Sequence, residues 1–291
     1  MPSLKKAYFL AFLSAALLGS SYIFFYLLLP NWSAGKILFY SYLLATGAAF
    51  AFHSKNLAFH IESIRKNKWP LLFAGACHGI GALLLLHSMR VLKPNIVVFL
   101  MQFVLVFVVA YSHIFLKERL SSLEEFGIAV VILGAFVMQW RQNLEFSLNS
   151  LIVVVSAALI ATGDFLAKRY VRYIRPETLN LGRLFAMTLT GAAFVIFSGE
   201  GVAVTTKSLS IAIASGLLSG FLGWELFYIA LKELELSKVN TIRALSPIFT
   251  GFYSYLLFGH IFTRSQWFGS LLIFIGVLSV VQGMRHRMEK V

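Results

Sequence analysis

The sequence predicts an all-α membrane protein with ten transmembrane helices, arranged as two inverted five-helix repeats. Three observations support this fold class. Of the 291 residues, 59% are hydrophobic and only 13% are charged, whereas a soluble domain has about 25% charged residues. The apolar residues form runs of about 20, the helical length that crosses the hydrocarbon core of a bilayer. Short motifs of the first half also return in the second half.

Ten apolar segments meet this length criterion. They do not alternate between apolar and polar residues, as the strands of a membrane β-barrel would. The first is longer than the roughly 7–15 apolar residues of a signal peptide, so we expect it to be a retained helix. The expected helices are residues 7–29, 36–53, 70–90, 95–115, 121–140, 150–168, 179–198, 209–231, 239–259 and 265–284.

The basic residues favour one orientation of these helices. With the N-terminus in the cytoplasm, the inner segments contain 17 Lys and Arg residues and the outer segments contain 6. Cytoplasmic loops carry such an excess, so we expect both termini in the cytoplasm of a plasma membrane, a bacterial inner membrane in our interpretation. The same bias explains the net charge of +13 without a nucleic-acid partner. The charged stretch Lys117-Glu118-Arg119 then belongs to an inner loop.

The two halves of the chain repeat each other. SAALLGSS, which begins at Ser14, matches SAALIATG, which begins at Ser156, at an offset of 142 residues. Because five helices per repeat is an odd number, the two repeats must have opposite orientations, as in many alternating-access transporters. We therefore expect a first repeat at 1–141 and a second at 142–291. The same offset pairs Gly81 with Gly223, Gly127 with Gly269, and Gly134 with Gly276.

Each half ends with a charged turn and a G-x6-G helix. The first half reads LKERLSSLEEFGIAVVILGAF and the second reads LSPIFTGFYSYLLFGHIFTRSQWFGSLLIFIGVLSV. These segments resemble EamA-type members of the drug/metabolite transporter superfamily, and the resemblance covers essentially the whole chain. It implies ten helices around a central cavity, lined mainly by helices 1, 3, 4, 6, 8 and 9. His260 stands where the family has an acidic residue, and Leu105 replaces the helix-4 proline that matches Pro247.

Four ionisable residues, Asp164, Arg183, Glu225 and Arg243, lie well inside expected helices of the second half. Each is about five or six residues from the inner helix end, which is roughly 7–9 Å at 1.5 Å per residue. A charge in hydrocarbon costs roughly 2.5–3.5 kcal/mol on insertion scales. We therefore expect these residues to bind substrate or protons. Static ion pairs between helices are the alternative, and Asp164 could also pair with Lys168 at i, i+4.

Other polar residues extend this candidate site. Asn240 and Pro247 share one face of the ninth helix with Arg243, and Pro247 should kink that helix. Trp224, beside Glu225, is suited to stack on a solute ring or cation. For all of them, simple helix packing is the competing interpretation. In the first half the candidates are Tyr22, His78 and Gln102, whereas His53, His87 and His113 lie near expected membrane boundaries and are interpreted as interfacial.

The function predicted from these features is secondary active transport. A small organic metabolite, such as an amino acid or related solute, would cross by alternating access coupled to protons or to exchange. The sequence contains no Walker, GxSxG, HExxH or CxxC motif, so we expect no enzyme, cofactor or metal. Membrane lipids are the other expected partners, and a homodimer remains open. A membrane-embedded lipid-modifying enzyme and a non-transporting membrane subunit are the alternatives.

Overall fold

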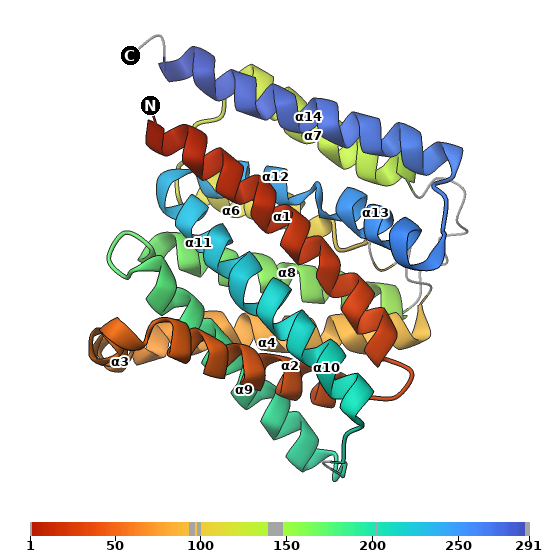
Figure 1. Ribbon diagram of the computed structural model, residues 1–291. Helices are drawn as coiled ribbons and strands as arrows, with labels where there is room; N and C mark the ends of the chain where they lie inside the picture. The colour runs from red at the N-terminus through yellow and green to blue at the C-terminus, as the bar shows by residue number, and fades with distance from the viewer. Residues whose placement is uncertain (1, 93–96, 98–99, 139–147, 202, 289–291) are drawn as a thin grey trace.

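The computed structural model describes residues 2–92, 97, 100–138, 148–201 and 203–288, and these contain helices and no strand. Seven of the helices are long and apolar enough to cross a membrane. They pack side by side in one bundle (Figure 1). The seven are α1 (Pro2–Leu28), α2 (Ala34–Phe52), α4 (Lys68–Val91), α8 (Leu148–Tyr170), α9 (Pro176–Phe197), the continuous stretch α10–η2–α11 (Thr206–Ser215, Gly216–Gly223, Trp224–Glu233) and α14 (Arg264–Met288).

Shorter helices occupy the other three expected segments. The fourth segment contains α6 (Phe103–Ile114), and the fifth contains α7 (Ser122–Met138). The ninth segment is broken into α12 (Leu236–Arg243) and α13 (Ser246–Phe258). Pro247 lies in the first turn of α13, where its missing N–H is tolerated. The kink expected at Pro247 is therefore a complete helix break. By length and hydropathy alone, the described residues provide seven membrane spans rather than ten.

The sequence reading missed one helix. Residues between the second and third expected spans form α3 (Leu57–Lys66), where a loop was expected. This helix has a charged face, with Lys66 and Glu62 paired at 2.6 Å, and it buries His60 on the opposite face. A short amphipathic helix lacks the long apolar run that predicts a membrane span, so that signal did not reveal α3. α3 lies at the same end of the bundle as both termini (Figure 1).

Local signals fix several helix ends. Ser33 precedes α2, and its Oγ accepts a hydrogen bond from the backbone N–H of Lys36 at 3.1 Å, as N-capping serines do. Pro176 begins α9, three residues before the expected start. Gly259 ends α13 with φ of 69°, a left-handed conformation that glycine adopts at low cost. These local signals set helix ends whose positions the apolar runs alone do not define.

Helices α7 and α14 form a close pair through glycines that recur in the two halves (Figure 1). A Cβ atom on Gly127 would lie 2.6 Å from the carbonyl oxygen of Gly276, and one on Gly134 would lie 2.7 Å from that of Gly269. Each glycine thus meets the sequence equivalent of the other. Such a crossed contact is what a two-fold relation between the repeats produces, and the small residues permit the close approach.

Two hydrogen bonds show the same two-fold relation at another place. The hydroxyl of Ser14 donates to the carbonyl oxygen of Gly223 at 2.8 Å, and that of Ser156 donates to Gly81 at 2.7 Å. Ser14 and Ser156 are equivalent in the sequence repeat, as are Gly81 and Gly223. Residues of the repeat motifs therefore make reciprocal contacts between the two halves. The expected division between residues 141 and 142 lies outside the described residues.

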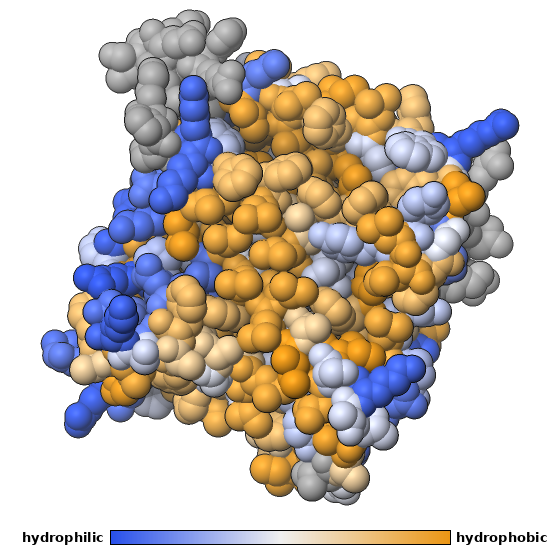
Figure 2. Space-filling model, viewed as in Figure 1, coloured by the Kyte–Doolittle hydropathy of each residue, from blue (hydrophilic) through white to orange (hydrophobic). Residues whose placement is uncertain are grey.

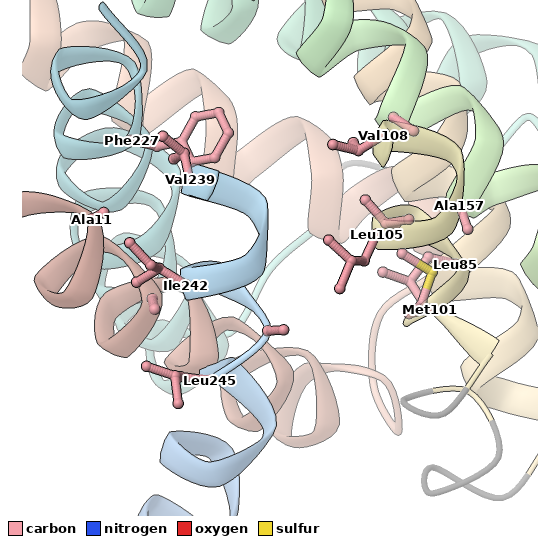
Figure 3. Packing of buried hydrophobic residues seen from close by; sticks show 14 of the residues in the cluster. Ala11, Leu85, Met101, Leu105, Val108, Ala157, Phe227, Val239, Ile242 and Leu245 are labelled. Carbon is pink, nitrogen blue, oxygen red and sulfur yellow. The ribbon is translucent and has the colours of Figure 1, made fainter. Parts of the chain in front are cut away.

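The surface is apolar over most of its middle. Figure 2 shows hydrophobic side chains across the centre of this face and hydrophilic ones gathered mainly along one edge. Phe197, Ile196 and Phe52 are exposed by 90%, 75% and 72%. Monomeric soluble proteins rarely expose contiguous apolar surface on this scale. Inside, apolar side chains of α12 such as Val239 and Ile242 point toward α11 and α1 (Figure 3) and belong to one large buried cluster.

Candidate functional site

A cavity of about 140 Å³ lies between helices of the two halves. An apolar cavity of about this size can hold a benzene molecule. Its walls come from α1, α2, α4, α6, α8, α9, η2, α11 and the break between α12 and α13. Among the residues expected at the site, the ones that line it are Tyr22, His78, Gln102, Arg183, Trp224, Asn240, Arg243 and Pro247.

Asp164 lies directly behind the cavity wall and is fully buried. Its Oδ2 is 2.8 Å from a terminal nitrogen of Arg243, and its Oδ1 is 3.0 Å from Nε2 of His78. These contacts connect α8 with α12 and α4. A carboxyl group with both oxygens engaged in this way holds the two cavity-lining side chains, Arg243 and His78, in place. Asp164 therefore orients the site from behind the wall and does not itself line it.

One proton lies between His78 and Asp164. Nδ1 of His78 is 3.0 Å from the carbonyl oxygen of Ala74, which can only accept, so Nδ1 carries a hydrogen. The 3.0 Å contact between Nε2 and the Asp164 carboxyl then needs a second hydrogen. It belongs either to an imidazolium or to a carboxylic acid. One hydrogen is therefore shared by these two side chains beside the cavity wall.

Trp224 lies between cationic side chains. The guanidinium carbon of Arg183 is 4.4 Å from the centre of its ring, and that of Arg243 is 5.6 Å away. The ring of His78 meets it edge-on with centroids 4.8 Å apart. Cations within about 6 Å of an aromatic face are attracted to it. Trp224 thus fixes the positions of the positive groups around the cavity.

Arg183, which contacts Trp224, is held by hydrogen-bond acceptors on η2 and α9. Its guanidinium donates to the carbonyl oxygen of Gly220 at 2.6 Å and to Oδ1 of Asn180 at 3.2 Å. Gly220 belongs to η2, a π-helical segment inside the membrane span. Such segments are rare and frequently mark functional sites. The carbonyl oxygen of Phe221 likewise accepts a hydrogen bond, from Asn180 at 3.0 Å.

Glu225 does not line the cavity. Its Oε2 accepts a hydrogen bond from Nδ2 of Asn180 at 2.8 Å, and its Oε1 is 3.0 Å from Nε2 of His53. The four membrane charges expected to share one depth thus form two separate groups, one around Asp164 and one around Glu225. Depth follows from position along each helix, whereas the direction of a side chain around the helix depends on packing.

Two site residues were missed in the sequence. His53 was interpreted as interfacial, yet it contacts Glu225. Asn180, which was not singled out, is fully buried and connects Glu225 with Arg183. The signal for Asn180 was available, since it is a polar residue three positions before Arg183 in an apolar segment. The expected alternative pairing of Asp164 with Lys168 is wrong, because Lys168 donates instead to carbonyl oxygens in the stretch Leu231–Leu234.

The loop that contains Glu118 closes one end of the bundle. The Glu118 carboxylate accepts hydrogen bonds from the backbone N–H groups of Leu236 and Ser237, at 2.8 and 3.2 Å. It thereby caps the N-terminus of α12, where a negative charge is favourable. Close by, the buried ammonium of Lys238 lies 3.1 Å from Glu124 of α7. The loop and α7, which follow one another in the chain, are thus both fastened to the distant α12 at this end.

At the other end of α13 the equivalent positions carry no carboxylate and line a cavity. His260 and Gln266 are the repeat equivalents of Glu118 and Glu124. Both line a second cavity of about 440 Å³. This cavity and the first share Tyr22 and Pro247 in their walls. The departure of His260 from the acidic family pattern therefore coincides with the more open end of the molecule.

Comparison with known proteins identifies the family. The profile of the EamA-like transporter family matches residues 5–140 and again 148–282. The chain belongs to the EamA-like transporter family. The resemblance seen in the paired turns and G-x6-G helices is thereby confirmed, and with it the membership of the drug/metabolite transporter superfamily. Together with the apolar helices, it makes the protein a multi-pass membrane protein of a transporter family.

Two further similarities agree with the EamA-like assignment. An uncharacterized transporter of Archaeoglobus fulgidus is 24% identical over 180 residues, which span 61% of this chain and 64% of that relative. The match thus covers less than two thirds of the relative. A solved crystal structure, described only as that of a protein, superposes with a TM-score of 0.82 at 15% identity. It covers 98% of this chain and 99% of that chain, and it supports the fold alone.

Proposed function

We propose that this EamA-family protein is a secondary active transporter that moves a small organic metabolite, such as an amino acid or related solute, by alternating access. The observation that carries the proposal is the cavity between the halves, with two arginines, a histidine and a tryptophan in its wall. Charged groups at membrane depth are costly unless they have a function. A cavity with few convergent polar groups is the usual form of a small-molecule site.

The proposed membrane arrangement has ten helices in two inverted repeats, with both termini in the cytoplasm of a plasma membrane. The reciprocal contacts of Ser14 and Ser156 with glycines of the opposite half support the two-fold relation. The positive-inside bias supports the orientation. The three shorter helices α6, α7 and α13 would then complete the spans, since non-helical backbone before α6 and α13 lines the cavity, where it is tolerated at membrane depth.

In this proposal the cavity binds polar groups of the solute through its cationic wall. Arg243 and Arg183 are suited to bind a negative group, and Asn240 has a side-chain oxygen available as an acceptor at the same wall. Trp224 and Tyr22 provide aromatic surface for an apolar portion. Asp164 keeps Arg243 in position from behind. The proton between His78 and Asp164 offers one means of coupling to a proton gradient; exchange of solutes is the other.

The structure corresponds, in this proposal, to a state closed to the cytoplasm. The contact of Glu118 with the start of α12 and the Lys238–Glu124 pair lie at the end expected to face inward. The larger cavity lined by His260 lies at the opposite end. Movement of one repeat against the other would break the inner contacts and open the solute site to the cytoplasm.

A ligand screen tests this proposal. Purified protein is heated with members of a panel of amino acids and related metabolites, and the melting temperature is recorded. A ligand at 100 times its Kd stabilises the state that it binds by about 2.7 kcal/mol, so at least one compound should raise the melting temperature. The same compound should have no effect on the Arg243→Gln variant. An equal shift in that variant would place the binding site elsewhere.

A further inference from the structure

A second titratable pair lies outside the solute cavity. The carboxyl of Glu225 and the imidazole of His53 are 3.0 Å apart, and their side chains are exposed by 10% and 13%. Neither residue lines the cavity. His53 follows the end of α2 and precedes α3, so it lies beyond the end of the α2 span, and part of its side chain is exposed. Glu225 lies in the first turn of α11, within a membrane-spanning stretch.

The surroundings of this pair contain few other ionisable groups. From α9, Asn180 and Arg183 face it, and Glu177 stands nearer the helix start. From α3, the ring of His60 lies 5.4 Å from that of His53. Burial and the nearby His53 lower the pKa of His60, and its Nδ1 is engaged with Thr178 at 2.8 Å. His60 is therefore neutral near pH 7 and does not compete for a proton.

Beyond these groups the surroundings of Glu225 are largely apolar. Phe221 and Phe52 approach His53 edge-on, at 6.0 and 5.1 Å between ring centroids. At the end of η2, Gly223 faces Leu17 and Leu18 of α1. Arg175 lies near His60 and not near the carboxyl of Glu225. Its charge helps to lower the pKa of His60. The charges that reach a proton bound between Glu225 and His53 are thus few, and Glu177 at the start of α9 is one of them.

Asn180 connects this pair to the cavity. Its Nδ2 donates both to Glu225 and to the carbonyl oxygen of Phe221, and its Oδ1 accepts from Arg183. Arg183 in turn lines the cavity and stacks on Trp224. A change of charge at Glu225 is therefore transmitted through one amide to a cavity-lining cation and to the carbonyl groups of η2.

We propose that Glu225 and His53 form a proton-binding site that is separate from the solute cavity and coupled to it through Asn180 and Arg183. A proton from water binds Nε2 of His53, passes to Oε1 of Glu225, and leaves by the reverse route. When Glu225 is protonated, it no longer has a negative charge to compensate the positive charge of Arg183. The affinity of the cavity for a negative group therefore rises. By linkage, a bound solute changes proton affinity at Glu225 by the same factor. The use of this proton in transport rests on the function proposed above; its binding does not.

Infrared difference spectroscopy tests the proton site directly. Protein in liposomes is titrated with acid, and the carbonyl stretching band of protonated carboxylic acids is followed. The wild type should show a titrating component that is absent in Glu225→Gln. In His53→Gln the component should remain but move to higher pH by about one unit or more, because a donor 3 Å from the carboxylate favours its charged form. Glu62→Gln, which removes an exposed acid on α3, serves as the control and should leave the component in place.

Two results would overturn the proposal. One is a spectrum of Glu225→Gln that retains the whole titrating band in protein whose helical circular dichroism equals that of the wild type. The other is an unchanged midpoint in His53→Gln, which keeps Glu225 and so remains informative if Glu225→Gln does not fold. No solute enters this measurement, so its outcome is independent of whether the protein is shown to transport.

Discussion

Asp164 joins two functional groups of the cavity wall from behind it. It is the common partner of Arg243 and His78, and all three lie on different helices. The pairing explains how the charge of Arg243 is accommodated at membrane depth, since the carboxylate compensates a charge that would otherwise be unpaired in a low-dielectric region. A purely structural ion pair and a transport site share this geometry. They differ in what happens when both partners are removed together.

Removal of Asp164 should destabilise the protein strongly. In Asp164→Leu, Arg243 keeps its charge but loses the partner 2.8 Å away, and loss of one member of a buried pair typically costs about 3–5 kcal/mol. The double variant Asp164→Leu/Arg243→Met removes the orphaned charge, so it should recover most of the melting temperature in detergent. Its solute response should stay lost. Recovery of both stability and solute response would assign the pair a structural role only.

The candidate site was partly predictable at the scale of residues. Asp164, Arg183 and Arg243 were recognisable as charges in apolar segments, and the structure places all three at or behind the cavity wall. Glu225 satisfied the same criterion, yet it contacts His53, away from the cavity. The sequence gives the depth of a residue from its distance to the helix end. It does not give the rotation of each helix, and that rotation separates Glu225 from Asp164.

Helix α12 is held at its N-terminus by a residue from a distant loop. It has only 8 residues, and the break before α13 means that α12 does not continue into a longer helix. Its N-terminal amides are satisfied by Glu118, whose preceding residue, Lys117, has the left-handed φ of 53°. That turn directs Glu118 toward α12. A sequence reading identified LKERLSS as an inner loop, but the partner of Glu118, about 118 residues away, was not visible in it.

Loss of this cap should loosen α12. In Glu118→Ala the N–H groups of Leu236 and Ser237 lose their acceptor, and loss of an N-terminal cap typically costs about 0.5–2 kcal/mol. Hydrogen exchange at the start of α12 should therefore accelerate by roughly 2- to 30-fold, following RT of 0.59 kcal/mol. Glu125→Ala, at an exposed site in the first turn of α7, is the matched control. Equal exchange in the two variants would contradict a capping role for Glu118.

The pair α7 and α14 depends on its glycines. Alanine at Gly127 would place a methyl group 2.6 Å from the carbonyl oxygen of Gly276, with the backbone of Val280 also within 3.0 Å. Backbone cannot yield as a flexible side chain does, so we expect destabilisation of about 1–3 kcal/mol. Gly47→Ala is the control, because a Cβ there meets nothing within 4 Å. A lower melting temperature should appear only in Gly127→Ala; equal values would exclude close packing as the reason for the motif.

At the scale of the whole molecule, the repeat was the most informative sequence feature. The structure adds a contact at the same offset of 142 residues, since the hydroxyl oxygens of Thr46 and Thr188 lie 3.1 Å apart. Repeated motifs are visible in sequence because equivalent positions in a two-fold arrangement face equivalent surroundings. The amphipathic α3 has no such counterpart in the expected spans, and it was missed. Its polar face ends the apolar surface at the end that carries the termini (Figure 1).

Labelling of single cysteines tests the orientation of the whole chain. Cys77 is buried and is first replaced by Ala. In intact cells a membrane-impermeant maleimide should label Lys207→Cys, which lies at the start of α10 on the expected outer side. It should not label Glu62→Cys on α3 until the membrane is opened, because α3 follows the inner end of α2. The reverse pattern would place both termini outside and would contradict the positive-inside interpretation.

Exchange in proteoliposomes is the most direct test of the central claim that the cavity is a solute-transport site. Vesicles are preloaded with an unlabelled amino acid or related metabolite that raises the melting temperature, and entry of the same radiolabelled compound is measured. Wild-type protein and Glu125→Gln should accumulate label above protein-free vesicles, and Arg243→Gln, folded to the same extent, should lose at least about tenfold in rate, which corresponds to 1.4 kcal/mol. Wild-type rates in Arg243→Gln would contradict the assignment of the cavity as the transport site.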